Sequence, residues 1–279
     1  MSEFVSTTDE VVVARRGGTI FVTLNRPQAK NALTASMTAA LGALARELKG
    51  RRDVRAVVLR GAGGVFCAGG DVKDFARHLM TEPPKAGEAD AVAVANRGFG
   101  ELLLQLDALE QALIVVVEGP AFGGANGFMA VADVVIAESG ARFSLSEVTL
   151  GLIPAQIAPF LVRKIGAFAT RRLALTGAAF DAAEALRIGL VDYIAEGPTH
   201  IESVILDSLN AVGRCEPHAM AMTKRIIAQA SGGVGHAVLD DAAVEFARAL
   251  RGAGRAGAAA FASKTTAPWV ETYGDAPAP

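Results

Sequence analysis

The sequence predicts an α/β fold, and two observations carry this prediction. Short apolar runs occupy residues 54–59, 113–117 and 134–137, and their length and continuity are typical of strands covered on both faces. The first two runs are each followed by a glycine-rich turn and then by helix-like sequence. From about Thr199 onward apolar residues recur at helical spacing, so we expect a β-α core followed by a wholly helical region.

The N-terminal part of the chain predicts a hairpin followed by a helix. Residues 11–14 and 19–24 are rich in β-branched side chains and are separated by Gly17 and Gly18. Residues 26–33 then interrupt the strand pattern, and Thr34 or Ser36 can cap a helix that runs through Ala45.

The two glycine-rich turns are the main functional signal. Residues 61–71 read GAGGVFCAGGD and residues 119–127 read GPAFGGANG. Glycine allows sharp turns and close approach of the backbone to a ligand, and the first N–H groups of a following helix have no partner inside it. Two such N–H groups that converge on one carbonyl oxygen form an oxyanion hole.

Three motifs in order give the chain a family resemblance. FCAGGD at residues 66–71, GPAFGG at 119–124 and FSLSEVTLGLIP at 143–154 resemble the crotonase (enoyl-CoA hydratase/isomerase) superfamily, from about Val11 to Trp269. The resemblance implies a crotonase-like spiral of repeated β-β-α units. Residues 1–198 would form the core that binds coenzyme A and carries out catalysis, and residues 199–279 a helical region that joins subunits into a trimer or a hexamer.

The resemblance also implies roles for individual residues. The N–H groups of Ala68 and Gly124 would form the oxyanion hole, and Glu147 would carry the proton, with a pKa raised by burial in an acyl pocket. An acyl-CoA thioester is the implied substrate, and coenzyme A belongs to that substrate, so no cofactor and no metal are expected. The implied substrate-binding set is Lys30, Ala68, Gly69, Gly70, Asp71, Gly124, Gln156, Phe261 and Lys264.

Several of these residues also have an ordinary structural interpretation. Asp71 can order the turn or cap a helix, and Gln156 can make a structural hydrogen bond. Lys30 can be a solvated loop lysine instead of a contact of the 3′-phospho-ADP group. Phe261 and Lys264, which the resemblance places against a neighbouring subunit's coenzyme A, can belong to an ordinary surface helix. The loop at 80–90 is expected near the acyl pocket.

One position departs from the hydratases of this superfamily. A second glutamate is expected three residues after Gly124, and the chain has Gly127 there. Three interpretations follow: a hydratase that relies on Glu147, similar to methylglutaconyl-CoA and isohexenylglutaconyl-CoA hydratase-like bacterial members; a Δ3,Δ2-enoyl-CoA isomerase with one glutamate; and an acyl-CoA-binding member with weak or no catalysis. We favour the first.

Composition excludes several other classes of protein. The 279 residues carry a formal net charge of −2, which disfavours nucleic acid as a partner. No apolar run approaches the roughly 18–20 residues that span a bilayer, and the N-terminus does not resemble a secretory signal, so we expect a cytoplasmic protein. The two cysteines, Cys67 and Cys215, lie far apart in the sequence, as is typical of a reducing compartment.

Overall fold

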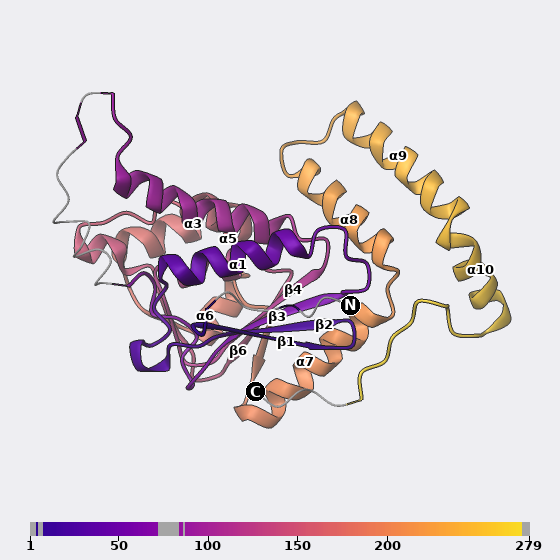
Figure 1. Cartoon of the computed structure of the whole chain (residues 1–279), viewed down its shortest axis with the longest axis horizontal. Coiled ribbons are helices and arrows are strands. Elements are labelled where there is room, and N and C mark those ends of the chain that lie inside the picture. The colour runs from indigo at the N-terminus through magenta and orange to yellow at the C-terminus, as the bar shows by residue number, and fades with distance from the viewer. Residues whose placement is uncertain (1–3, 5–7, 72–83, 86, 275–279) are drawn as a thin grey trace.

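The structure is a computed structural model that describes residue 4 and residues 8–71, 84–85 and 87–274. Its strands form two sheets, and Figure 1 labels most strands of the larger one. The larger sheet has six strands in the order β1-β2-β3-β4-β6-β9. These strands are β1 (Val11–Arg16), β2 (Thr19–Leu24), β3 (Ala56–Gly61), β4 (Ala112–Val117), β6 (Val134–Glu138) and β9 (Tyr193–Ala195).

The predicted N-terminal hairpin and helix are confirmed. β1 and β2 pair antiparallel, from Val11 opposite Leu24 to Arg16 opposite Thr19, while the other neighbours in this sheet run parallel. The turn between them uses Gly17 with φ of 56°. The following helix is α1 (Ala35–Glu47), and Thr34 caps it by accepting a hydrogen bond from the N–H of Met37.

Both faces of the parallel strands are covered, as their continuous apolar sequence predicts. On one face Val57 and Leu59 of β3 belong to a cluster that includes side chains of α1 and α3 (Ala91–Asp107). On the other face Ala56 and Val58 pack with Ile201, Ile205 and Leu209 of α7 (Gly197–Gly213). Successive side chains of a strand point to opposite faces, so an all-apolar strand fits only between two layers.

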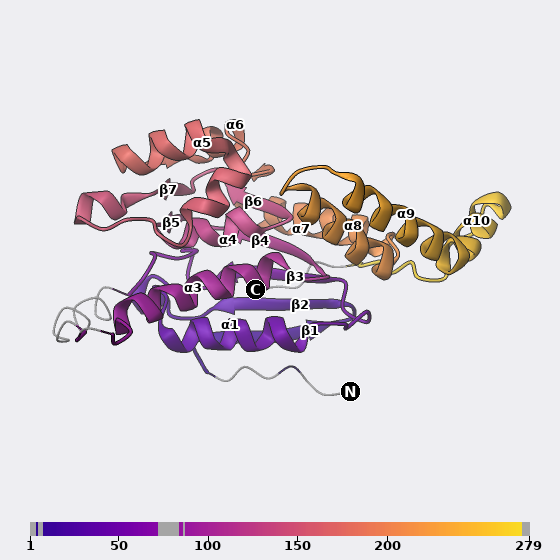
Figure 2. The same cartoon turned by 90° about the horizontal axis from the view of Figure 1, so that it is seen from above.

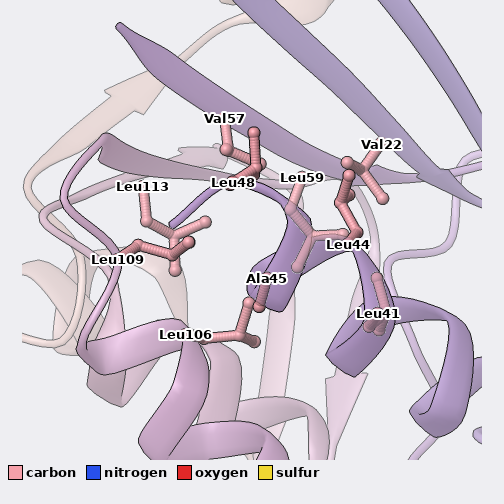
Figure 3. A pocket seen from close by; sticks show the side chains of 10 residues that line it. All are labelled: Val22, Leu41, Leu44, Ala45, Leu48, Val57, Leu59, Leu106, Leu109 and Leu113. Atoms are coloured by element: carbon pink, nitrogen blue, oxygen red, sulfur yellow. The ribbon is translucent and has the colours of Figure 1, made fainter. Parts of the chain in front are cut away.

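A small void remains in the first of these layers, between α1 and the sheet (Figure 3). Its volume is about 10 Å³, and aliphatic side chains such as Leu44, Leu48 and Leu113 line it. A void of this size is at the lower limit for one water and offers no polar partner, so it is a packing defect and not a ligand site.

The smaller sheet carries the second strand of each repeated unit. It contains β5 (Pro120–Phe122), β7 (Arg142–Ser144) and β8 (Phe180–Asp181), and β5 pairs parallel with β7. The chain therefore passes from β4 to β5 and into α4 (Ala125–Val131), and then from β6 to β7, the short 3₁₀ helix η2 (Ser146–Leu150) and α5 (Ala158–Thr176). This alternation between two sheets is the predicted spiral of β-β-α units.

Residues 166–192 contain the second part of α5, a short strand and a further helix. Gly166, with φ of 77°, interrupts α5 instead of starting it, and the two-residue strand β8 precedes α6 (Ala182–Arg187). Gly189, with φ of 79°, follows Ile188, the C-cap residue of α6. The helix-like sequence that directly follows the first glycine-rich turn, and part of the loop at 80–90, lie outside the described residues.

The C-terminal helices divide into two groups. α7 packs on the large sheet, so the division predicted between residues 198 and 199 falls inside a helix of the core. The helical arm consists of α8 (Pro217–Ala230), α9 (His236–Arg251) and α10 (Ala253–Ser263), which extend to one side of the sheets (Figures 1 and 2). Among the described helices, none combines the length and the apolar character needed to cross a membrane.

A buried arginine joins this arm to the core. Arg55, which is 4 % exposed, donates from Nη1 to the carbonyl of Cys215 at 2.6 Å and from Nη2 to the carbonyl of Trp269. These two residues lie just before α8 and just after α10. Trp269 also donates from Nε1 to the carbonyl of Arg214 at 3.1 Å. The two ends of the arm are thus held together at one point on the sheet.

Candidate active site

The smaller sheet places the second glycine turn beside the segment that carries Glu147. The parallel register of β5 and β7 pairs Phe122 with Ser144. Beyond this pair, the N–H of Gly123 donates to the carbonyl of Ser144 at 2.9 Å, and the chain from Ser144 enters η2. Gly124 is the N-cap residue of α4, and Glu147 is in the first turn of η2.

The first glycine turn lies directly against the second. Cys67 bridges Ala121 in parallel register, and the N–H of Phe122 donates to the carbonyl of Cys67 at 3.0 Å. Gly69 has φ of 91°, and a Cβ at this position would lie 2.9 Å from the carbonyl oxygen of Phe122 and 3.7 Å from the nitrogen of Gly124. Only glycine allows both this backbone conformation and this approach, so the two turns meet as the sequence predicts.

The structure disfavours the expected role of the Ala68 N–H as an oxyanion donor. The N–H of Ala68 donates to the carbonyl of Lys30 at 2.9 Å, and one backbone N–H that is already paired inside the fold cannot serve an incoming carbonyl equally well. The N–H of Gly70, two residues further on, makes no hydrogen bond to any described residue, and neither does that of Gly124. The N–H groups of Gly70 and Gly124 are therefore both available as donors, as far as the described residues show.

Glu147 has the environment of a proton-transfer residue. Its Oε1 lies 3.3 Å from the position of a Cβ at Gly123, the residue before Gly124. Its Oε2 is buried and has no hydrogen-bond partner among the described residues. Burial therefore raises the pKa of Glu147 from its ordinary value, opposed by a hydrogen bond from its own backbone.

Aromatic side chains pack against the two glycine turns. A Cβ at Gly124 would lie 3.5 Å from the ring of Phe99, which belongs to α3. Phe128 of α4 is fully buried and meets Phe99 and Phe66 edge to face, with ring centroids 5.8 and 6.2 Å away. Burial also raises the pKa of the Cys67 thiol to about 12, so this thiol beside Phe66 stays neutral.

The structure explains why position 127 carries no carboxylate. Gly127 is buried in α4, and a Cβ there would lie 2.8 Å from Cγ2 of Ile157 and 2.9 Å from Cδ1 of Leu103. Both of these neighbours are almost fully buried. Two aliphatic side chains thus occupy the space into which a glutamate at this position would extend.

Asp71 is held by the protein itself. Its Oδ2 lies 3.0 Å from Nη2 of Arg26, and Arg26 also pairs with Glu10 and donates to the carbonyl of Ala32. Because this ion pair engages the carboxylate, the structure favours the turn-ordering interpretation of Asp71 over substrate binding.

Lys30 lies on an exposed turn that is fixed to the first glycine turn. Its backbone is left-handed, with φ of 51°, and its carbonyl accepts the hydrogen bond from Ala68. The next residue, Asn31, is fully buried and donates from Nδ2 to the carbonyls of Ala62 and Val65. The lysine is therefore exposed on a rigid support near the site.

Gln156 precedes α5, and its side chain packs against α3. Its Nε2 donates to Oδ1 of Asn96 at 2.9 Å, and its Oε1 lies only 2.0 Å from where a Cβ at Gly100 would be. The structural hydrogen bond that the sequence left open is thus present. Phe99 lies between Asn96 and Gly100 on the same helix. The hydrogen-bonded pair of Gln156 and Asn96 is therefore close to the Phe99 ring, which packs against Gly124.

The two predicted C-terminal contacts lie on the helical arm. Phe261 is 88 % exposed on α10, and Lys264 is the left-handed C-cap residue of that helix. α10 is at the far end of the arm, away from α3 and α4 (Figure 2). The structure therefore does not bring these residues together with the glycine turns of their own chain.

Sequence reasoning missed one side chain in the site. Asn126 is fully buried and donates from Nδ2 to the carbonyls of Gly123 and Ser144, each at 3.0 Å. A signal for it exists in the sequence, since a polar side chain inside the otherwise small and apolar start of α4 needs a partner there.

The arrangement is thus two N–H groups that have no partner among the described residues, near a carboxylate with one buried oxygen, on a spiral of β-β-α units. A family model described as enoyl-CoA hydratase/isomerase matches residues 14–272. The chain therefore belongs to the enoyl-CoA hydratase/isomerase family, and it is an enzyme of that family.

Individual relatives agree with this assignment. An enoyl-CoA hydratase/isomerase from Marinobacter aquaeolei is 39% identical with a TM-score of 0.90, and covers 95% of this chain and 100% of its own. Pseudomonas aeruginosa AtuE is 43% identical with a TM-score of 0.89, and the match covers 94% of this chain and 100% of AtuE. The 2,3-dehydroadipyl-CoA hydratase of Escherichia coli is 30% identical over 79% of this chain and 82% of its own length.

Proposed function

We propose that the protein is an enoyl-CoA hydratase that adds water to a 2-enoyl-CoA thioester through an enolate held in an oxyanion hole. The observation that carries this proposal is the position of Glu147. Its carboxylate has a buried oxygen without a partner among the described residues, and it lies against Gly123, next to the free N–H of Gly124.

The N–H groups of Gly70 and Gly124 would hold the thioester carbonyl oxygen. Ionised Glu147 takes a proton from water while the water oxygen forms a bond to Cβ, and the electron pair of the double bond moves onto the carbonyl oxygen. The enolate then collapses, and Cα takes the proton back from Glu147. The two N–H groups stabilise the charge on the oxygen, a contribution of about 3–4 kcal/mol for each donor.

A Δ3,Δ2-enoyl-CoA isomerase is the second candidate. Glu147 would take a proton from Cα of a 3-enoyl thioester and return it to Cγ, with the same enolate between the two steps. One observation favours this reaction: Leu103 and Ile157 fill the space at Gly127, so α4 supplies no second carboxylate to activate water. Acyl-CoA binding without catalysis is the third candidate, and the raised pKa of Glu147 speaks against it.

For the acyl group we propose a branched dicarboxylic tail of the methylglutaconyl or isohexenylglutaconyl type. The motifs around Gly124 and Glu147 support this choice. The named substrate of the Escherichia coli relative also carries a second carboxylate. The Gln156 and Asn96 amides, close to Phe99, are the polar groups available to such a tail. A higher kcat/KM for 3-methylglutaconyl-CoA than for crotonyl-CoA would support the assignment, and the reverse order would contradict it.

The reaction is tested by following the absorbance of crotonyl-CoA and of a 3-enoyl-CoA with wild type and Glu147→Gln. Hydration of the 2-enoyl substrate by wild type, with a loss of about 10²-fold or more in the variant, supports the proposal. Reaction of the 3-enoyl substrate alone supports the isomerase. Glu184→Gln is the matched control, because Glu184 is a surface carboxylate paired with Arg172 and Arg187. Full activity in Glu147→Gln would rule out the mechanism.

We further propose a homotrimer or a dimer of trimers in which Phe261 and Lys264 reach the coenzyme A of a neighbouring subunit, while Lys30 contacts it from the subunit's own loop. The exposure of Phe261 at the end of the arm supports this arrangement. Light scattering that gives a monomer at working concentration would contradict it. Lys264→Ala is expected to raise KM for the acyl-CoA without changing kcat.

A further inference from the structure

The side chain of Asn126 has no part in the steps described above, yet it makes two hydrogen bonds at the centre of the site. Its Nδ2 donates to the carbonyl of Gly123, and the backbone N–H of Asn126 donates to the same carbonyl, each at 3.0 Å. The Gly123 carbonyl is thus fixed by two donors from one residue.

The Gly123 carbonyl and the Gly124 N–H belong to the same peptide unit. In a planar trans peptide the C=O and N–H bonds point in opposite directions, so fixing the carbonyl also fixes the direction of the N–H. Asn126 holds the Gly123 carbonyl toward α4, and the Gly124 N–H is turned to the opposite side, where it has no partner among the described residues. Donors on the carbonyl also polarise the peptide and strengthen the N–H as a donor.

The same Nδ2 connects this peptide to the strand that leads to Glu147. It donates to the carbonyl of Ser144 at 3.0 Å, the carbonyl that also accepts from the N–H of Gly123. Ser144 is the last residue of β7, three residues before Glu147. One buried amide therefore contacts both the peptide with the oxyanion donor and the segment with the catalytic carboxylate.

We propose that Asn126 is a positioning residue that directs the Gly124 N–H at the substrate carbonyl and sets its place relative to Glu147. This inference rests on the proposed oxyanion chemistry. The residue is costly for stability alone, because its Oδ1 is buried without a partner among the described residues. Both carbonyls that it contacts also keep a backbone donor, so the fold can survive its loss.

The experiment compares Asn126→Ala and Asn126→Asp with wild type, using crotonyl-CoA turnover and the absorbance of a bound cinnamoyl-CoA. A conjugated thioester absorbs at longer wavelength when its carbonyl is polarised, so this shift reports the oxyanion hole without turnover. For Asn126→Ala we expect kcat to fall by about tenfold to a hundredfold, KM to change by less than about threefold, and the absorbance shift to shrink. Asn126→Asp, held neutral by burial, keeps one donor and should be intermediate.

The matched control is Asn210→Ala. Asn210 belongs to α7, and its side chain also makes two hydrogen bonds to backbone groups, the N–H and the carbonyl of Tyr273. The substitution should lower the melting temperature without changing kcat or the absorbance shift. If Asn126→Ala does not fold, Asn126→Asp alone decides. Wild-type kcat and an unchanged shift in the folded variants overturn the role of Asn126. A wild type that neither turns over enoyl thioesters nor shifts the absorbance overturns the proposed function, and this role with it.

Discussion

The guanidinium of Arg26 and the carboxylate of Asp71 form an ion pair, with 3.0 Å between Nη2 and Oδ2. Their side chains are only 16% and 12% exposed. Asp71 directly follows Gly70, and Arg26 begins the turn that carries Lys30. The pair therefore joins the exposed lysine turn to the residue after Gly70, whose N–H has no partner among the described residues.

Replacement of Asp71 by Asn should lower stability more than it affects substrate binding. Asn keeps the shape but loses the charge opposite Arg26, for an expected loss of about 1–2 kcal/mol in the free energy of unfolding. KM for an acyl-CoA should stay near its wild-type value. Urea denaturation and initial rates measure the two effects. The control is Asp241→Asn, which removes an exposed partner of Arg225 and should change stability by less than about 0.5 kcal/mol.

Glu147 predicts a specific dependence of activity on pH. In the proposed mechanism Glu147 must be ionised, and burial raises its pKa above the ordinary value of 4.5. Activity in kcat/KM should therefore be lost as the pH falls through this raised pKa, which places the acid limb above pH 4.5. A pH–rate profile with an acid limb at or below the ordinary value would contradict the environment described for Glu147.

The same pKa determines the sign of a stability effect. Between the ordinary and the raised pKa the folded protein holds a proton that the unfolded chain has lost, so stability falls as the pH rises through this window. Glu147→Gln removes this penalty. The variant should gain stability relative to wild type as the pH rises from 4.5 through the raised pKa, and the gain should then level off. Melting temperatures over this range measure the difference.

Gly127→Glu should damage the fold instead of supplying a second catalytic carboxylate. Its side chain would collide with Leu103 and Ile157, and overpacking typically costs about 1–3 kcal/mol before the carboxylate is desolvated. Gly98→Glu is the matched control, since Gly98 is exposed on α3 with nothing within 4 Å of its Cβ position, and it should be neutral or stabilising. A folded Gly127→Glu variant with higher hydratase activity would refute this account.

Backbone esters can separate the two candidates for the first oxyanion donor. An α-hydroxy acid in place of Gly70 replaces its N–H by an ester oxygen and keeps the side chain unchanged, and we expect kcat to fall by about 10²–10³-fold. The same change at Ala68 removes the hydrogen bond to the Lys30 carbonyl, so stability should fall while kcat stays within about threefold of wild type. The opposite pattern would return the donor to Ala68.

The sequence predicts the strands and turns well because their signals are local. Continuous apolar runs indicated β3, β4 and β6, and Thr34 indicated the start of α1. The pairing of the Ala68 N–H inside the fold could not be predicted, since it depends on a carbonyl at Lys30, far away in the sequence. β8 was missed for a similar reason, because its two residues are a strand only through their pairing with β7.

Local sequence patterns also could not predict side-chain contacts between different helices and strands. The sequence predicts Gln156 as a site residue, but the position of its side chain depends on the absence of a Cβ at Gly100 of α3. α7 has the same helical pattern as the arm, and only its packing on Ala56 and Val58 places it in the core. In each case the position is determined by a contact with a residue that is distant in the sequence.

The attachment of both arm ends to Arg55 makes the arm a closed loop and not a free tail. A protease that cleaves in the segment between α8 and α9 would nick the chain without releasing a fragment, because Cys215 and Trp269 remain bound to the same guanidinium. The two pieces should co-elute in gel filtration and separate only in denaturant. The direction in which the arm carries the exposed Phe261 is therefore set at the start of β3, by the side chain of Arg55.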